Sequence, residues 1–394
     1  MSVLIRCIAA SVGCALSVGC ARQAHVASTA ATAPLTSGVA ARSWIDSTAQ
    51  TPQAQIYRTW MQYLDASGGH YTRAAFTPSP YWVASEQQRW HVYALALAYL
   101  PEGAAPDVLT IEPTTDSSGE YRVVTRFTAA NENNAMRSRT ATVTVFAVPS
   151  PTGWLLANAL PRLTRTWHRD TVGPITYVYA SQYPFRRDSA QHAAAFVDSL
   201  AAALGVPPPE HLTYFLTSSD EQVYQIMGLE TEKRWGPVGG VAQPTNYQLF
   251  SGIPALGEDY RHELTHIVIL PLMSGNTTYL VSEGIPTWFG GTTGMDYATA
   301  VRGLAGFLRE HPTVSLDSIM DGHYPVAQFY PAAAVLVSMV YARGGTEAVK
   351  SLFDDGPTNQ DLRSGLTHLL GQPWDGIAMQ WRELVLSFGP AARQ

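Results

Sequence analysis

Cysteine is scarce in this sequence. The three cysteines among its 394 residues are Cys7, Cys14 and Cys20, all within the first twenty positions. The rest of the chain therefore offers no pair that could form a disulfide, and its stability must come from packing.

Charge is also sparse. Charged residues make up 14% of the chain, the formal net charge is −6, and no long run carries one sign. A surface that binds nucleic acid needs clustered Lys and Arg side chains, and the sequence has no such cluster. We therefore expect no nucleic-acid partner.

Long apolar runs are missing as well, since no stretch approaches the roughly 20 residues that cross a bilayer. Residues 1–20 carry a shorter apolar run after Arg6, which is typical of a secretory signal peptide, so we expect an exported protein. Small residues before Cys20 resemble a bacterial lipoprotein processing box. Cys20 is then either a lipid anchor in the cell envelope or one more small residue of the signal peptide of a periplasmic or extracellular protein.

The length predicts more than one folded domain, because single cores stop growing at a few hundred residues. Residues 21–42 are rich in Ala, Ser and Thr and read as a flexible tether. Residues 43–170 combine helical and strand patterns and predict an α+β cone, an order that resembles nuclear transport factor two-like domains. The helices are expected at 56–64 and 90–99, and the strands at 121–128, 141–148 and 153–159.

Residues 171–394 predict a small mixed sheet followed by a helical lobe. Strands are expected at 175–179 and 212–216, joined by a helix over 188–204. Asp188 is the expected N-cap of that helix, and Gly205 stands where a left-handed C-cap belongs. After Gly257 the periodicity is helical almost to the end of the chain.

The segment 259–268 contains His262, Glu263 and His266 in the pattern His-Glu-x-x-His. Four residues advance a helix by about one turn, so both imidazoles project from one face and could hold a single ion. Such a match arises by chance in a chain of this kind at a frequency on the order of 1%. A structural zinc site usually closes all four positions with Cys or His, whereas the mature chain would keep at most one Cys, so a structural site is the weaker interpretation.

A third ligand is expected from the next helix. Glu283 lies 17 positions after His266 and is followed by Gly284. Two histidines and one carboxylate leave a fourth zinc position open, which is typical of catalytic sites. The two motifs resemble those of the gluzincin branch of the peptidase MA clan, which pairs a His-Glu-x-x-His helix with a Glu in a following helix.

The resemblance implies a zincin-like domain with one zinc ion per chain, held by His262, His266 and Glu283. It implies hydrolysis of peptide bonds in a peptide or protein substrate, with Glu263 as general base and acid. Gluzincins often place a Tyr or His near the developing oxyanion. Tyr330 is the preferred candidate, ahead of Tyr324 and His323, although a Tyr packed beneath the site would have the same sequence pattern.

A glycine-rich segment precedes the zinc motif. Gly239, Gly240, Val241 and Ala242 resemble the Gly-Gly-x-Ala strand along which such peptidases bind an extended peptide, although an ordinary turn before a strand would look the same. The Gly-x-Met-x-Asn version of aminopeptidase N is not evident, which favours internal cleavage over amino-terminal trimming.

Two other functions compete with a peptidase. The chain could be an inactive envelope scaffold or binding lipoprotein that keeps the zincin fold. Alternatively, the domain at 43–170 could bind a small ligand on its own, separately from the second domain. An intact ligand set favours an active enzyme over the scaffold.

Overall fold

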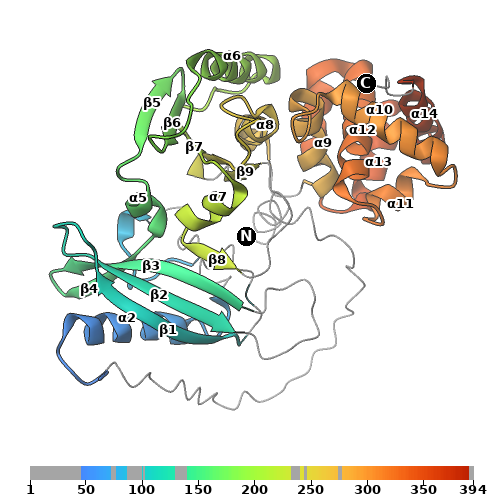
Figure 1. The fold of residues 1–394 in the computed structure, drawn as a ribbon. Helices are drawn as coiled ribbons and strands as arrows, with labels where there is room; N and C mark the ends of the chain where they lie inside the picture. The colour runs from blue at the N-terminus through green and yellow to red at the C-terminus, as the bar shows by residue number, and fades with distance from the viewer. Residues whose placement is uncertain are drawn as a thin grey trace, which may run out of the picture. The chain divides into compact units, whose positions relative to one another are not determined.

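The computed structural model describes residues 46–71, 77–86, 100, 103–128, 140–231, 240–243, 246–273 and 277–389. The chain divides into two compact units. Of the described residues, the first unit comprises those between 46 and 166 and those of 221–231, and the second comprises those of 167–220 and those from 240 onward. An antiparallel sheet, a mixed sheet and a helical lobe confirm the predicted α+β class (Figure 1). The expected signal peptide and tether at 1–42 lie outside the described residues.

The first unit is an antiparallel sheet packed against a helix. Its strands are β1 (Ala105–Pro113), β2 (Tyr121–Thr128), β3 (Thr140–Ser150) and β4 (Gly153–Ala157) in that order, and β8 (Leu229–Thr231) pairs with β3. Helix α2 (Pro52–Ala66) buries Ile56, Trp60 and Leu64, which fall on one face at four-residue spacing. Trp60 Nε1 donates to Thr125 Oγ1 over 2.8 Å and so joins the helix to β2.

The expected elements of this unit match the structure with one correction. Helix 56–64 lies inside α2, and the strand at 121–128 coincides with β2. The strand predicted at 153–159 was too long, because Ala159 begins the short helix α5 (Ala159–Leu163). Two further short helices are η1 (Ala84–Glu86), which precedes β1, and α7 (Asp220–Ile226), which follows β7 and precedes β8. The helix expected at 90–99 lies outside the described residues.

The second unit begins with a five-stranded mixed sheet. Its order is β5 (His168–Val172), β6 (Ile175–Tyr179), β7 (Leu212–Leu216), β10 (Gln248–Ser251) and β9 (Gly240–Gln243). The three central strands run parallel, and β5 and β9 are antiparallel edges. The strands predicted at 175–179 and 212–216 coincide with β6 and β7.

Helix α6 (Arg187–Leu204) connects the parallel strands β6 and β7. Gly205 ends it in the left-handed conformation with a φ of 60°, as expected. The expected N-cap was wrong: Arg186 occupies that position, and Asp188 lies inside the first turn. The Asp188 carboxylate in the first turn still interacts favourably with the positive end of the helix dipole and so stabilises α6.

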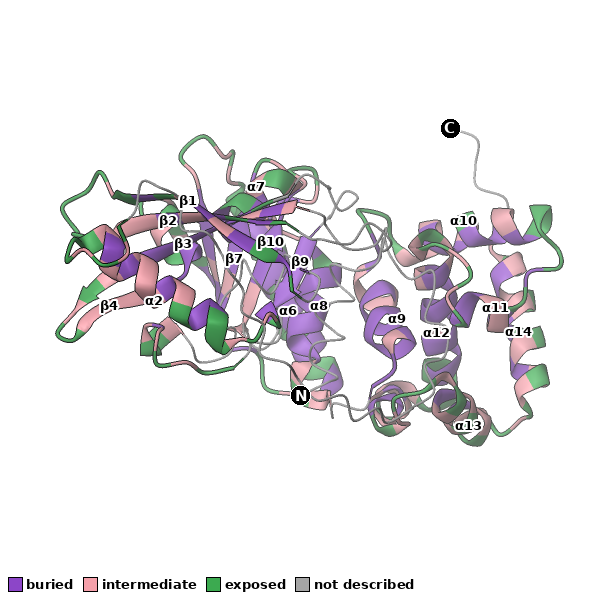
Figure 2. Cartoon of the chain, turned by 90° about the horizontal axis from the view of Figure 1, so that it is seen from below, coloured by how far each residue is buried: buried purple, intermediate pink, exposed green. Residues whose placement is uncertain are grey.

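Helices make up the rest of the second unit. They are α8 (Arg261–Val268), η3 (Leu270–Leu272), α9 (Tyr279–Gly290), α10 (Tyr297–Glu310), α11 (Leu316–Met320), α12 (Val326–Ser351), η4 (Leu352–Asp354), α13 (Asn359–Leu370) and α14 (Trp374–Ser387). One apolar core runs continuously from the sheet into these helices. Figure 2 shows that α8, α9 and the first part of α12 consist largely of buried residues.

Helices α9 and α12 pack closely and run in the same direction. The rings of Tyr279 and Phe329 stack with centroids 5.0 Å apart, and Gly284 lies against Ala333 one turn further along. A Cβ at Gly284 would lie 3.0 Å from three atoms of Ala333, so glycine permits this approach.

Within the described residues, no helix combines the length and the apolar character that a membrane span requires.

Candidate metal centre

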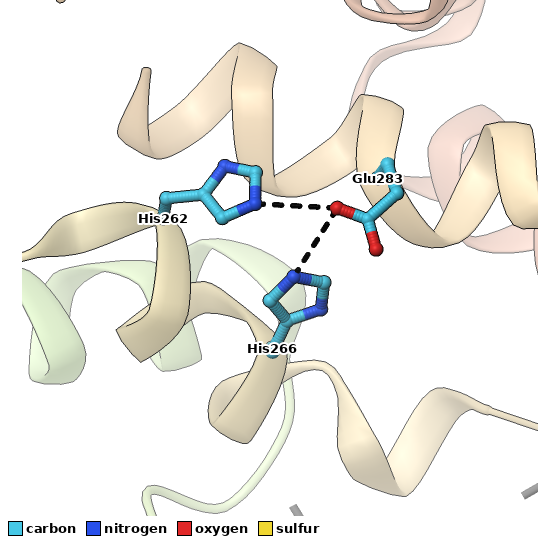
Figure 3. A group of neighbouring side chains, drawn as sticks. All are labelled: His262, His266 and Glu283. Atoms are coloured by element: carbon cyan, nitrogen blue, oxygen red, sulfur yellow. Dashed lines mark hydrogen bonds and ion pairs between the residues drawn. The ribbon is translucent and has the colours of Figure 1, made fainter. Parts of the chain in front are cut away.

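Three potential metal ligands converge in the second unit. His262 and His266 project from α8, and Glu283 projects from α9 (Figure 3). One ligand atom from each residue lies within 4.8 Å of the other two, and all three side chains are buried. The structure therefore brings together the three residues that the sequence motifs predicted as ligands, in a group that could bind a metal ion.

The orientation of the His262 ring follows from a backbone contact. Its Nδ1 lies 2.8 Å from the carbonyl oxygen of Gly291. A carbonyl oxygen only accepts, so Nδ1 carries a proton; Nε2 then presents a lone pair when the ring is neutral and donates to Glu283 when the ring is protonated. That Nε2 lies 3.3 Å from Glu283 Oε2.

His266 directs a second ring nitrogen at the same carboxylate oxygen. Its Nε2 lies 3.6 Å from Glu283 Oε2 and has no hydrogen-bond partner among the described residues. An orphaned ring nitrogen, a second ring nitrogen and a carboxylate oxygen thus face one another away from water. A cation between these atoms, or a proton on one imidazole, would offset the buried carboxylate charge, and two imidazoles with one carboxylate are a ligand set that zinc accepts.

Burial and the closeness of these charged groups shift the pKa values of three side chains in the site. Burial lowers the pKa of His262, but its hydrogen bond to Glu283 and the charges of Glu263 and Glu283 outweigh burial and raise it. Burial raises the pKa of Glu263, and the neighbouring histidines offset this rise only in part. Burial also acts to raise the pKa of Glu283, yet His266 and His262 bring it well below its usual range.

The loop before α8 is fixed to the sheet by polar contacts. Tyr214 Oη donates to the Gly257 carbonyl over 2.7 Å, and Tyr177 Oη donates to the Glu258 carbonyl over 3.1 Å. The buried Glu258 carboxylate accepts from the Arg186 backbone N–H at 2.9 Å and from Arg186 Nε at 3.2 Å. These bonds set where α8 begins and therefore where both histidines point.

Two glycines bring the end of α9 against the start of α8. A Cβ at Gly290 would lie 2.4 Å from the carbonyl carbon of Arg261 and 2.5 Å from the His262 backbone nitrogen. Only glycine fits such a contact, and it places the Gly291 carbonyl within reach of the His262 ring. Pro286 lies in the interior of α9, two turns after its start and one turn beyond Ser282.

Glu263 lies beside the ligands and contacts the edge strand β9. Its Oε2 accepts a hydrogen bond from the Ala242 backbone N–H over 2.9 Å. Leu264, Ile267 and Val268 are buried in the core, as expected for the other faces of α8. The helix thus combines a polar site with a tightly packed support.

Of the three oxyanion candidates, only Tyr330 contacts a proposed ligand among the described residues. Its ring stacks on His262 with centroids 5.4 Å apart and an interplanar angle of 13°. Tyr324 packs instead against Phe307 of α10, and His323 is exposed in the turn before α12. The structure thus places a Tyr ring against the site, while its role stays a prediction.

The glycine-rich segment contributes Gly240, Val241 and Ala242 to β9, where all three are buried. Gly239 lies outside the described residues. Sequence reasoning did not find Gly291, Glu258 or Arg186, which orient the ligands through backbone atoms and an ion pair between the half-exposed Arg186 and the buried Glu258. The adjacent glycines Gly290 and Gly291 are the one sequence signal that could have indicated a close approach there.

Comparisons with known proteins give little beyond this geometry. No protein-family model matches the sequence, and no curated protein matches it. Among solved structures, the chain is similar to a mutant M1 zinc metallopeptidase from Deinococcus radiodurans bound to a Tyr-Ser-Ala substrate. The identity is 14%, the TM-score is 0.35, and the match covers 69% of this chain and 62% of that one. The chain therefore spans less than two thirds of the length of that metallopeptidase.

Proposed function

We propose that this protein is a zinc-dependent peptidase whose site is formed by His262, Glu263, His266 and Glu283. One observation carries the proposal: the Nε2 atoms of both histidines face the same oxygen of Glu283, at 3.3 Å and 3.6 Å, in a buried group. With both rings neutral, these three atoms are all acceptors, and a cation bound between them would stabilise the group. Glu263, next to His262 in the chain, supplies a carboxylate that is not one of the three converging ligands.

His262, His266 and Glu283 would hold the ion. When bound, zinc acts as a Lewis acid that activates water and polarises a carbonyl group. The hydrogen bond from His262 Nδ1 to Gly291 fixes the ring with Nε2 toward Glu283, where it would be available to the metal. The three protein ligands leave one position for water or substrate.

Glu263 performs the proton transfers. Its carboxylate accepts a proton from the attacking water as the water oxygen bonds to the carbonyl carbon of the peptide. Glu263 then gives this proton to the departing amine nitrogen as the carbon–nitrogen bond breaks. Burial raises the pKa of Glu263 and so makes its carboxylate a stronger base. The Tyr330 hydroxyl is the proposed donor to the developing oxyanion.

The predicted export segment makes the cell envelope the proposed location of this peptidase, either lipid-anchored through Cys20 or free outside the cytoplasm. A peptide or protein is the proposed substrate. The absence of a recognisable amine-anchoring motif in the sequence favours cleavage within a chain over trimming from its amino terminus.

Digestion of a peptide library, read by mass spectrometry, tests the function. We expect the purified protein to cleave library peptides, a chelator to stop cleavage and added zinc to restore it. Glu263→Gln should keep the metal and lose hydrolysis by at least about 10²-fold, the range assigned to general acid–base catalysis.

Two results would contradict the proposal. Undiminished turnover in Glu263→Gln would remove this carboxylate from the reaction. A zinc-loaded wild-type protein that cleaves no peptide of the library would support the scaffold alternative instead.

A further inference from the structure

Glu263 is attached to the edge strand β9 through one of its two oxygens. Oε2 accepts the Ala242 N–H over 2.9 Å, whereas Oε1 receives no hydrogen bond from the described residues. The carboxylate is almost fully buried, with 5% of the residue exposed. One oxygen is therefore held by the backbone, and the other is left for proton transfer.

Gly240 makes this contact sterically possible. A Cβ at this position would lie 2.8 Å from Glu263 Cγ and 2.7 Å from a ring carbon of Tyr260, closer than carbon atoms pack. Gly240 is not among the glycines with positive φ, so space and not backbone conformation requires a glycine here. The stem of Glu263 occupies the place that a side chain would fill.

Gly240 and Ala242 act on the same face of the strand. Residues two apart in a strand point to one side, and here that side meets α8. The missing side chain at 240 leaves the space that the Glu263 stem and the Tyr260 ring occupy. The neighbouring strand β10 pairs Leu249 with Ala242 and so fixes the position of β9 on its other side.

We propose that Gly240 and the Ala242 N–H are positioning groups for the general base, an inference that rests on the proposed peptidase function. They hold Glu263 in one rotamer and leave Oε1 for the water proton. Precise placement matters because a displacement of about 1 Å can lower a rate by about 10²-fold. An N–H has one proton to donate, so a peptide aligned along β9 must take its hydrogen bonds from other backbone groups of the strand.

The substitution Gly240→Ala in the full-length chain tests the inference, with Gly303→Ala as a matched control. Gly303 lies in α10, and a Cβ there would meet no atom within 4 Å. We expect Gly240→Ala to lower kcat by about 10²-fold while KM and zinc content stay at the wild-type level. Gly303→Ala should match the wild type in all three.

Other outcomes separate the inference from the function on which it rests. A Gly240→Ala protein with wild-type kcat would overturn the inference alone, and so would one that loses zinc together with activity, since Gly240 would then support the fold. A wild-type chain without hydrolysis would overturn the proposed function and this inference with it.

A second variant removes the N–H itself and serves if Gly240→Ala does not fold. Ala242→Pro deletes the donor, and because that N–H bonds to Glu263, its loss removes no bond of the sheet. We expect the same loss of kcat with zinc retained. Wild-type kcat in Ala242→Pro would contradict the positioning role.

Discussion

The His262 ring donates from Nδ1 to the Gly291 carbonyl over 2.8 Å, and this bond ties the start of α8 to the end of α9. A proposed metal ligand thus also holds together the two helices that supply the ligand set. Metal binding and the packing of these helices should therefore be coupled.

Removal of the metal should lower thermal stability, because an ion that binds only the folded chain stabilises it by mass action. At free zinc of about 1,000 times Kd the expected gain is about 4 kcal/mol. Differential scanning calorimetry with a zinc titration measures it, and His266→Ala is the control that should not respond. A melting temperature indifferent to zinc in the wild type would contradict the coupling.

Two variants separate the role of the Tyr330 ring from the role of its hydroxyl group. Tyr330→Phe keeps the stack on His262 but deletes the proposed oxyanion donor, so we expect kcat to fall by about 10²- to 10³-fold with zinc affinity unchanged. Tyr330→Ala also removes the stack and should weaken zinc binding. Kinetics with metal titration distinguish the two, and wild-type kcat in the Phe variant would leave Tyr330 only a packing role.

Gly284 sets the distance between α9 and α12. In Gly284→Ala the new Cβ would lie 3.0 Å from Ala333 atoms, and such overpacking should lower the unfolding free energy by about 1–3 kcal/mol. Gly306→Ala in α10 meets open space and should raise it by about 0.5–1 kcal/mol. Urea unfolding measures the unfolding free energy of both variants. Equal stability of the two would show that α9 and α12 can move apart at no cost in unfolding free energy.

Asp355 should make stability depend on pH. Burial, together with the neighbouring Asp354, raises its pKa to about 6 against an opposing effect of His368. Its Oδ2 has no hydrogen-bond partner among the described residues, and the carboxylate lies directly over Gly365. The folded chain therefore holds a proton that the unfolded chain releases at lower pH.

For an acid whose pKa rises on folding, the stabilising contribution is complete below the unfolded pKa and is lost as pH rises through the folded value. The wild type should thus lose stability between about pH 4 and pH 6 relative to Asp355→Asn. Thermal melts of both proteins across this range measure the difference. Parallel pH profiles would contradict the raised pKa.

The sequence predicted those elements whose pattern is local. Strands β6 and β7 were found at their observed bounds because each is a short apolar run between turn residues. Strands β8, β9 and β10 have three or four residues, too few to establish a period. Strand β1 was missed because Pro106 and Pro113 argue against a strand, although both stand near its ends.

The candidate site divides in the same way. The two histidines follow from helical geometry, and Glu283 follows from its place on the next helix. The Gly291 carbonyl and the Ala242 N–H are backbone groups, which carry no residue signature, and their partners become visible only once the chain is folded. The N-cap expected at Asp188 failed because tertiary contacts of Arg186 with Glu258 decide where α6 begins.

The metal content of the purified protein tests the central claim most directly. Elemental analysis by inductively coupled plasma mass spectrometry should find about one zinc ion per chain in the wild type, since three ligands form one site. Glu283→Ala, which removes the shared oxygen, should retain far less. A wild-type protein that binds no zinc, or a Glu283→Ala variant that binds it equally well, would contradict the account.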